Sequence, residues 1–252
     1  MLTRERKDHI LDVLRRDRRV VAKSVSRDLG LSEDTIRRDL RELAAEGLLK
    51  RVHGGALPTA PAMADYAGRS ALSPEGKAAI GRAAAAMVQP GQVVIMDGGT
   101  TTVQMARHFA PDLRATVVTH SPSVAAVLAE HAYIDVELIG GRLYKHSVVA
   151  VGAVAAEAIG RIQADLFFMG ASGVHPELGC TTGDAEEAAI KRLLSSRAAE
   201  TVLLASREKL GVVAPFRILG CEALGSLILE AGLPDEATKP FQDLGVPILF
   251  GR

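Results

Sequence analysis

The chain has 252 residues, of which 48% are hydrophobic and 24% charged, as is typical of a globular protein with one large or two modest domains. Two cysteines, Cys180 and Cys221, are too few for a disulfide framework or a four-cysteine zinc site, and we expect both to be buried. No segment has the roughly 18 apolar residues of a membrane span. The N-terminal residues carry alternating charges, whereas a signal peptide has an apolar segment there. We therefore expect a cytoplasmic protein with no membrane partner.

The formal net charge is zero, but the charges are unevenly distributed. Residues 1–58 carry 14 Lys and Arg against 10 Asp and Glu, a net charge of +4, and residues 59–252 carry 16 against 20, a net charge of −4. The basic excess suggests an anionic partner, although a solvated surface would explain it equally well. We expect a head (residues 1–58), a linker rich in Ala, Pro, Thr and Gly (residues 59–73) and a body (residues 74–252).

The head shows three segments with helical periodicity, followed by a short strand. Apolar residues recur at helical spacing over 4–16, over 22–29 and from Ser32 onward, where the serine is a good N-cap. Residues 48–52 are predicted as a strand, and Gly54-Gly55 as a turn. Three helices followed by a hairpin is the layout of a winged helix-turn-helix.

The third helix is the candidate recognition helix. At about 100° per residue, Ile36 points inward, and Arg38 lies opposite to it. Arginine can bond guanine through two hydrogen bonds in the major groove. A small structural domain with a solvated arginine face fits the pattern alone equally well. The candidate DNA-binding residues are Ser32, Thr35, Arg37 and Arg38 at the helix, and Lys50, Arg51 and His53 on the wing, near phosphates.

Beyond the linker, strand-like and helix-like segments alternate. Strands are predicted at 93–97, 115–119, 135–140, 164–169, 201–206, 226–229 and 246–250. Helices are predicted at 101–109, 121–130 and 185–199. This alternation predicts an α/β domain with a mainly parallel, Rossmann-like sheet and helices on both faces.

Ligands bind to such sheets at the carboxyl ends of the strands. The segment Asp97-Gly98-Gly99-Thr100-Thr101-Thr102 follows a strand and opens a helix. Its glycines let N–H groups approach an anion, its hydroxyls add donors, and the helix N-terminus adds partial positive charge. The segment therefore suits a phosphate, but it lacks the nucleotide and dinucleotide glycine patterns. An ordinary turn with a threonine cap is the alternative.

Other residues after the predicted strands also have two interpretations each. Gly140-Gly141 would let a ligand approach closely or simply form a turn. Lys209 would complete an anion site or be solvated. Glu187 and Lys191 are spaced i, i+4 on a helix, which also fits a surface ion pair of about 0.3–0.5 kcal/mol. His120 follows a strand, but a lone histidine predicts no metal site.

The chain resembles the DeoR family of bacterial transcription regulators over nearly its whole length. TIRRDL at 35–40 and EGLLKRVHGGA at 46–56 resemble the recognition helix and wing of that family. The motifs that resemble its sensor domain are DGGTTT at 97–102, VTHS at 118–121, GG at 140–141, ADLFFMGASGV at 164–174, EEAAIKR at 186–192 and SREKL at 206–210. The sensor domain of the family is similar in fold to ribose-5-phosphate isomerase.

The resemblance implies a repressor of a sugar or sugar-alcohol catabolic operon. Such a protein binds double-stranded operator DNA as a homo-oligomer and responds to a phosphorylated sugar, without cofactor, metal or catalytic residues. By position, Gly98–Thr102 would hold the phosphate and Lys209 would contact it, while Glu187 and Lys191 would face the sugar. The remaining candidates for the effector site are Asp97, His120, Gly140 and Gly141.

The sequence departs from the family pattern at two motifs. His120 replaces the usual asparagine, and Ala205 precedes Ser206 where the family often has aspartate. The isomerase pairs two acidic residues near its substrate, whereas this chain has Met169 and Ser172 around the corresponding segment. A sugar-phosphate isomerase with an added DNA-binding head is the alternative function, with Glu187 as its available base.

Overall fold

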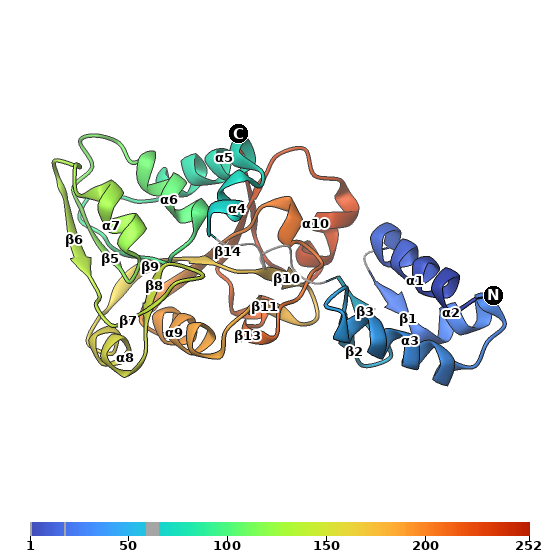
Figure 1. The fold of residues 1–252 in the computed structure, drawn as a ribbon. Helices are drawn as coiled ribbons and strands as arrows, with labels where there is room; N and C mark the ends of the chain where they lie inside the picture. The colour runs from blue at the N-terminus through green and yellow to red at the C-terminus, as the bar shows by residue number, and fades with distance from the viewer. Residues whose placement is uncertain (1, 18, 59–65) are drawn as a thin grey trace.

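The computed structural model describes residues 2–17, 19–58 and 66–252, which form a small N-terminal head and a larger α/β body (Figure 1). The head contains an antiparallel sheet with strand order β1-β3-β2. Its elements are α1 (Thr3–Asp17), β1 (Val20–Val21), α2 (Ala22–Leu29), α3 (Glu33–Ala45), β2 (Lys50–Val52) and β3 (Gly55–Leu57). This arrangement is a winged helix-turn-helix, as the sequence predicted.

Local sequence signals set the ends of α3. The Ser32 side chain accepts a hydrogen bond from the Thr35 N–H at 3.2 Å and so caps the helix. At the other end, Gly47 has a φ of 75°, a left-handed conformation that glycine adopts without a Cβ penalty. The apolar stripe of Ile36 and Leu40 is buried in the core of the head, as its spacing predicted.

A buried ion pair joins the first and third helices of the head. The Arg6 guanidinium on α1 forms two hydrogen bonds with the Asp39 carboxylate on α3, and the Nη2–Oδ1 distance is 2.9 Å. Both side chains are buried. Periodicity could not reveal this pair, because its partners are far apart in the sequence and each occupies what looks like a polar helix position.

The predicted linker is partly helical. Helix α4 (Tyr66–Ala71) lies within residues 59–73, for which composition predicted no regular structure, and residues 59–65 lie outside the described residues. The helix has no buried residue, but polar contacts fix it to the body. Arg69 Nη2 donates to the His146 carbonyl at 2.6 Å, and the Lys77 ammonium donates to the Arg69 carbonyl. Six residues are too few to show a hydrophobic stripe.

The body is built on a seven-stranded sheet in which every neighbouring pair is parallel. In spatial order the strands are β15 (Ile248–Gly251), β14 (Ser226–Glu230), β12 (Ala198–Leu204), β9 (Ala164–Gly170), β4 (Val93–Met96), β5 (Ala115–Thr119) and β6 (Ile134–Leu138). Figure 1 shows helices on both faces: α5 (Pro74–Ala85), α6 (Thr100–Arg107) and α7 (Pro122–Leu128) on one, and α8 (Ala153–Ile159) and α9 (Ala185–Ser196) on the other. The α/β prediction is therefore confirmed.

Short antiparallel strands and further helices decorate this sheet. They are the pair β7 (Arg142–Tyr144) and β8 (Val149–Val151), the sheet of β10 (Gly173–His175), β11 (Gly179–Thr182) and β13 (Phe216–Leu219), the 3-10 turns η2 (Arg207–Lys209) and η3 (Cys221–Ala223), and α10 (Asp235–Gln242). The sequence did not predict the short strands, because three or four residues show no usable alternation. The helices α5, α8 and α10 were not predicted either.

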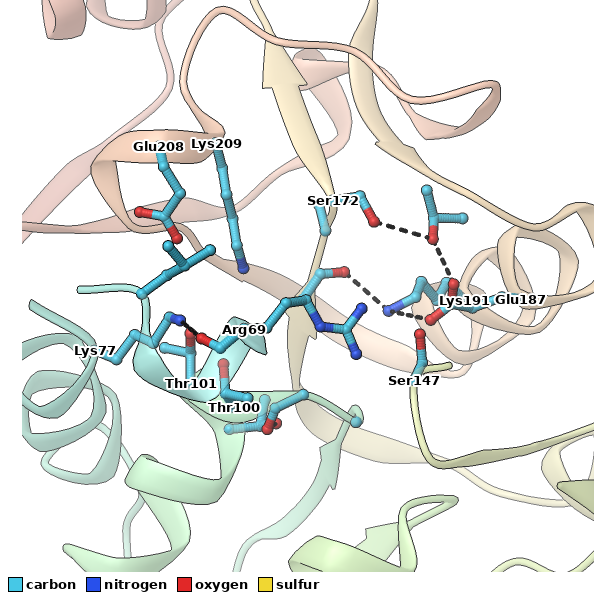
Figure 2. Close-up of a pocket in the computed structure, with 17 residues that line it drawn as sticks. Arg69, Lys77, Thr100, Thr101, Ser147, Ser172, Glu187, Lys191, Glu208 and Lys209 are labelled. Carbon is cyan, nitrogen blue, oxygen red and sulfur yellow. Dashed lines mark hydrogen bonds and ion pairs between the residues drawn. The ribbon is translucent and has the colours of Figure 1, made fainter. Parts of the chain in front are cut away.

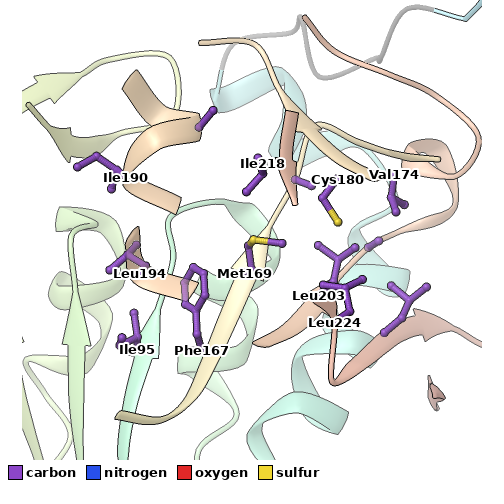
Figure 3. Close-up of a cluster of buried hydrophobic side chains, with 14 of the residues drawn as sticks. Ile95, Phe167, Met169, Val174, Cys180, Ile190, Leu194, Leu203, Ile218 and Leu224 are labelled. Carbon is purple, nitrogen blue, oxygen red and sulfur yellow. The ribbon is translucent and has the colours of Figure 1, made fainter. Parts of the chain in front are cut away.

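Two hydrophobic clusters cover the two faces of the large sheet. Ile95 and Phe167 face the cluster that includes Leu194 of α9 (Figure 3), whereas their neighbours Val94 and Phe168 face the cluster under α5 and α6. This division follows from the alternation of side chains along a strand. The predicted burial of both cysteines is confirmed. Among the described residues, no helix is long and apolar enough to span a membrane.

The order of the strands places a crevice at the centre of the sheet. From β4 the chain first continues to β5 and β6 on one side, and then crosses to β9 on the other side. Such a switch point leaves space at the carboxyl ends of the two central strands, where α/β proteins bind ligands. Here these ends are Asp97, after β4, and Gly170, the last residue of β9.

Candidate functional site

Asp97 is the polar centre beneath this crevice. Its carboxylate is fully buried and accepts hydrogen bonds from the N–H groups of Gly98 (2.7 Å) and Gly170 (2.8 Å), from His120 Nε2 (2.9 Å) and from the Lys191 ammonium. Burial by itself would raise the Asp97 pKa, but the charge of Lys191 and the contacts with His120 outweigh it and hold that pKa well below its usual range. Asp97 is therefore a permanent anion that organises its neighbours.

Glu187 and Lys191 of α9 belong to this buried network and are not on the surface. Their exposed fractions are both 3%, so the interpretation of a surface ion pair was wrong. Lys191 Nζ lies 3.0 Å from the Gly170 carbonyl oxygen and 3.7 Å from Glu187 Oε1, and the other Glu187 oxygen accepts from the Thr182 hydroxyl. Burial by itself would lower the Lys191 pKa, but the carboxylates of Asp97 and Glu187 outweigh it and raise that pKa. Helical spacing showed the pair but could not show which face is covered.

His120 supports the network without lining the cavity. Its ring is fully buried, with Nε2 on Asp97 and Nδ1 2.9 Å from the Ala150 carbonyl oxygen of β8. The ring therefore joins the end of β4 to the short pair β7–β8. Gly140-Gly141 also lies away from the cavity lining, and a Cβ on Gly141 would lie 2.9 Å from the Val151 carbonyl oxygen. Gly141 therefore has a packing role, whereas a Cβ on Gly140 would lie in open space.

The N-terminus of α6 forms one wall of the cavity. Gly99 precedes the helix with a φ of 130°, and no side chain caps this end. The first N–H groups of a helix have no partner within it, and here they open onto the cavity lined by Gly98 to Thr102. Thr101 is 4% exposed, and its hydroxyl has no hydrogen-bond partner among the described residues. This wall offers unpaired donors, as expected of an anion site.

Cationic side chains from separate elements surround this wall. Lys77 comes from α5, Lys209 from η2 and Arg69 from α4, and Figure 2 shows Arg69 between the lysines and Lys191. Burial lowers the Lys77 pKa, and it lowers the Lys209 pKa to about 8 although Glu208 opposes the shift. Clustered ammonium groups with depressed pKa values are typical of sites that receive an anion. Lys209 was predicted here, whereas Arg69 and Lys77 were not.

The cavity, whose empty volume of about 610 Å³ includes open solvent, is lined mainly by residues of α6, η2 and α9 and of the segments next to them. Of the predicted effector residues, it brings together Gly98, Gly99, Thr100, Thr101, Thr102, Glu187, Lys191 and Lys209. The lining also contains residues that were not predicted as effector-binding from the sequence: Arg69, Leu72, Lys77, Ser147, Gly170, Ala171, Ser172, Thr182 and Glu208. The residues on helices α4 and α5 do not follow a strand, so the predicted strand ends could not place them at the cavity.

The head presents the predicted DNA-binding residues on one helix and the wing. Arg38 and Arg51 are exposed, and Arg38 has no ion pair or hydrogen bond within the described residues. Arg37 is exposed too, but it pairs with Glu33 at 2.8 Å. Lys50 is half-buried on β2 and His53 is exposed in the following turn. Of the two arginines predicted to bind DNA from this helix, Arg38 is therefore the one more available to a base edge.

A winged helix-turn-helix joined to an α/β body with a cation-lined cavity is the organisation of a DNA-binding regulator. Family models match both parts of the chain: the DeoR-like helix-turn-helix domain over residues 6–60 and the DeoR C-terminal sensor domain over residues 73–231. The chain belongs to the DeoR family, and it is a DNA-binding transcription regulator.

Full-length relatives have the same organisation. The HTH-type transcriptional regulator GlpR of Haloferax volcanii is 35% identical over 253 residues, covering 100% of this chain and 99% of that protein. The regulator GolR of Listeria innocua is 33% identical over 97% of both chains. The transcriptional repressor GlcR of Bacillus subtilis is 32% identical over 94% of this chain and 92% of its own. These relatives are named as regulators and not as enzymes.

The isomerase alternative is not supported. Ribose 5-phosphate isomerase A of Methanocaldococcus jannaschii matches 53% of this chain and 52% of its own, with 16% identity and a TM-score of 0.39. A similarity of that size carries no argument about activity. The relatives over the whole length identify a regulator instead.

Proposed function

We propose that this regulator is a repressor whose affinity for operator DNA is set by a phosphorylated sugar bound in the cavity of the body. The observation that carries the proposal is the group of unpaired donors at the N-terminus of α6, where the enclosed Thr101 hydroxyl has no partner in the described part of the chain. An enclosed donor of this kind costs free energy unless a ligand satisfies it. The relative GlcR is named a repressor, which supports the sign of the regulation.

The phosphate binds at the α6 end of the cavity. There the helix amides and the Thr101 hydroxyl donate to its oxygens, while Lys77 and Lys209 neutralise its charge, since a helix dipole alone is a weak partner for a charged phosphate. Arg69 lies within the same cavity and adds a third cation. The geometry thus favours an anion over a neutral sugar.

The sugar hydroxyl groups lie toward the Glu187 end. Glu187, Ser172 and Thr182 offer acceptors and donors there. Figure 2 shows Glu187 and Ser172 on the side of the cavity away from Lys77, and the Thr182 hydroxyl bonds Glu187. Lys191 is held on Asp97 and Gly170, so it serves mainly to fix the position of Glu187. The two ends together select a molecule with a phosphate at one end and hydroxyls at the other.

The head binds double-stranded operator DNA as part of a homo-oligomer. Winged helices commonly bind paired half-sites as symmetric dimers. The exposed Arg38 reads bases, while Lys50, Arg51 and His53 contact phosphates. The effector favours an arrangement of the body in which the heads fit the operator differently, which requires only a difference in affinity between two arrangements. In bacteria and archaea this takes place in the cytoplasm.

The proposal is tested with a panel of sugar phosphates and their free sugars. A ligand at 100 times its Kd adds about 2.7 kcal/mol to the free energy of unfolding, which a thermal-shift assay detects. Fluorescence anisotropy with promoter DNA then measures the change in operator affinity. A free sugar that binds as tightly as its phosphate would overturn the proposal.

Two variants locate the phosphate in the cavity. Thr101→Val removes the unpaired hydroxyl, so it should keep or raise the melting temperature of the ligand-free protein while weakening effector binding. Lys209→Ala should bind the operator normally but no longer respond to the effector. The exposed Lys239→Ala on α10 is the matched control. A normal response by both cavity variants would remove the phosphate from this site.

A further inference from the structure

One carboxylate oxygen of Glu208 lacks a partner within the described residues, although the protein encloses it. Glu208 lies in η2 and lines the cavity. Its Oε1 accepts a hydrogen bond from the Ser206 hydroxyl at 2.6 Å, whereas Oε2 is buried and forms no hydrogen bond. An enclosed, unsatisfied carboxylate oxygen is costly. It is also an anionic acceptor close to the cationic side chains Lys77 and Lys209, which line the same cavity.

Glu208 lies at the end of the cavity assigned to the phosphate. Figure 2 shows Glu208, Lys209, Lys77 and Thr101 together, with Glu187 and Ser172 on the other side of Arg69. Burial lowers the pKa of both lysines, and the charge of Glu208 acts on both in the opposite direction, so the carboxylate lies near each ammonium group. A sugar hydroxyl bound near Glu187 is on the wrong side of the cavity for this oxygen.

A group that fills this end must accept hydrogen bonds from several donors and give one hydrogen to Glu208. A singly protonated phosphate meets both needs, because three oxygens accept and its P–OH group donates. Sulfate has the same shape but carries no proton near neutral pH. A fully ionised oxyanion would therefore place a charged oxygen without a proton against the Glu208 carboxylate, which is repulsive.

We propose that Glu208 is a specificity-determining residue that accepts the P–OH hydrogen of the bound phosphate and thereby selects protonated phosphate over fully ionised oxyanions such as sulfate. The proton stays on the phosphate, and no bond is made or broken. The inference rests on the proposed function, since it requires a phosphate at the N-terminus of α6. It assigns to the Glu208 carboxylate a role that attraction by lysines does not provide.

The test compares inorganic phosphate with sulfate on the full chain at pH 7 by thermal-shift titration. The wild-type protein should bind phosphate at least tenfold more tightly than sulfate. Glu208→Gln keeps the size of the side chain, removes its charge and adds an N–H donor, so it should bind sulfate at least tenfold better and bring the ratio of the two Kd values close to one. Glu177→Gln, an exposed carboxylate outside the cavity lining, is the control and should keep the wild-type ratio.

The outcomes separate the two levels of the proposal. Equal binding of both anions by the wild-type protein would overturn the role of Glu208 while leaving the phosphate site in place, and this result needs no variant. A Glu208→Gln protein that tightens both anions by the same factor would show a general charge effect and overturn the selectivity. Binding of neither anion to the wild-type protein would overturn the phosphate site, and with it this assignment.

Discussion

The head and the body arrange their charges in opposite ways. In the head, the cations Arg38 and Arg51 are exposed, whereas in the body Asp97 and Lys191 are 0% and 3% exposed. DNA is a large polyanion that docks on an outer surface, where contacts are screened by salt. A small ligand is enclosed, so its charged partners must be fixed in place before it arrives and must be paired while it is absent. The comparison explains why one site is exposed and the other is buried in a network.

The largest expected effect comes from separating the two regions. Removal of residues 1–58 should abolish operator binding and leave a body that unfolds cooperatively, because the two hydrophobic clusters of the body contain no head residue. In the full chain, the logarithm of operator affinity should fall with that of salt concentration, with a slope near −0.9 per phosphate contact. Gel shifts and circular dichroism measure both properties. A truncated body that still shifts the operator would show that DNA binding is not confined to the head.

The buried network should be the most sensitive point of the body. Asp97→Ala leaves the Lys191 ammonium and the His120 ring without their shared carboxylate, so the free energy of unfolding should fall by about 3–5 kcal/mol. Urea denaturation measures this loss. Asp135→Ala, an exposed carboxylate on β6, should change stability by only about 0.5 kcal/mol. Similar losses for the two variants would show that the network is not organised around Asp97.

Within the head, base reading and phosphate contact should separate. Arg38→Ala should weaken operator binding by about 1–3 kcal/mol and relax base preference at one position, because this arginine has no ion pair within the described residues and faces outward on α3. Lys50→Ala on the wing should weaken all sequences alike. Anisotropy titrations on operator and random DNA measure both. Equal losses on the two DNAs for Arg38→Ala would contradict a base contact.

The smallest expected effect is a pH dependence confined to the body. The Lys209 pKa of about 8 lies below the ordinary value of 10.5, so its ammonium is charged at pH 7 and neutral at pH 9. Affinity for a phosphorylated effector should therefore fall by about tenfold, or ~1.4 kcal/mol, as the pH rises through 8. Calorimetry from pH 7 to 9 measures the fall, and Lys209→Ala should lose it. An affinity that rises over this range would exclude Lys209 as the phosphate partner.

The regions also differ in how far their sequence predicted them. The three helices of the head were predicted almost to the residue, because the Ser32 cap, the Gly47 terminus and the Ile36–Leu40 stripe are signals within one short segment. The two-residue strand β1 was not predicted, and Gly55 lies in β3 instead of the predicted turn. In the body, the main strands and the Gly98–Thr102 wall were predicted for the same reason. The boundaries at residues 58 and 74 stay predictions.

Arg69, Lys77 and Glu208 were not predicted at the cavity, because their positions depend on how distant elements pack. Lys77 follows no strand, and its side chain reaches the cavity because α5 packs beside α6 and its ammonium bonds the carbonyl of Arg69. The spacing of Glu187 and Lys191 indicated an exposed pair, and only the position of α9 across the end of β9 covers them. Burial of a polar group depends on its neighbours, which local spacing does not specify.

The sequence by itself determined the fold class, since caps, periodicity and glycine-rich turns act over a few residues, and its motifs indicated the family. Only the tertiary structure decided which charges are buried together. The switch between β4 and β9 brings Asp97, Gly170 and Lys191 into one network, although Asp97 and Lys191 are 94 positions apart. The physical reason is that a parallel sheet aligns the carboxyl ends of strands that the chain visits far apart, so the chemistry of the cavity arises from the order of the strands.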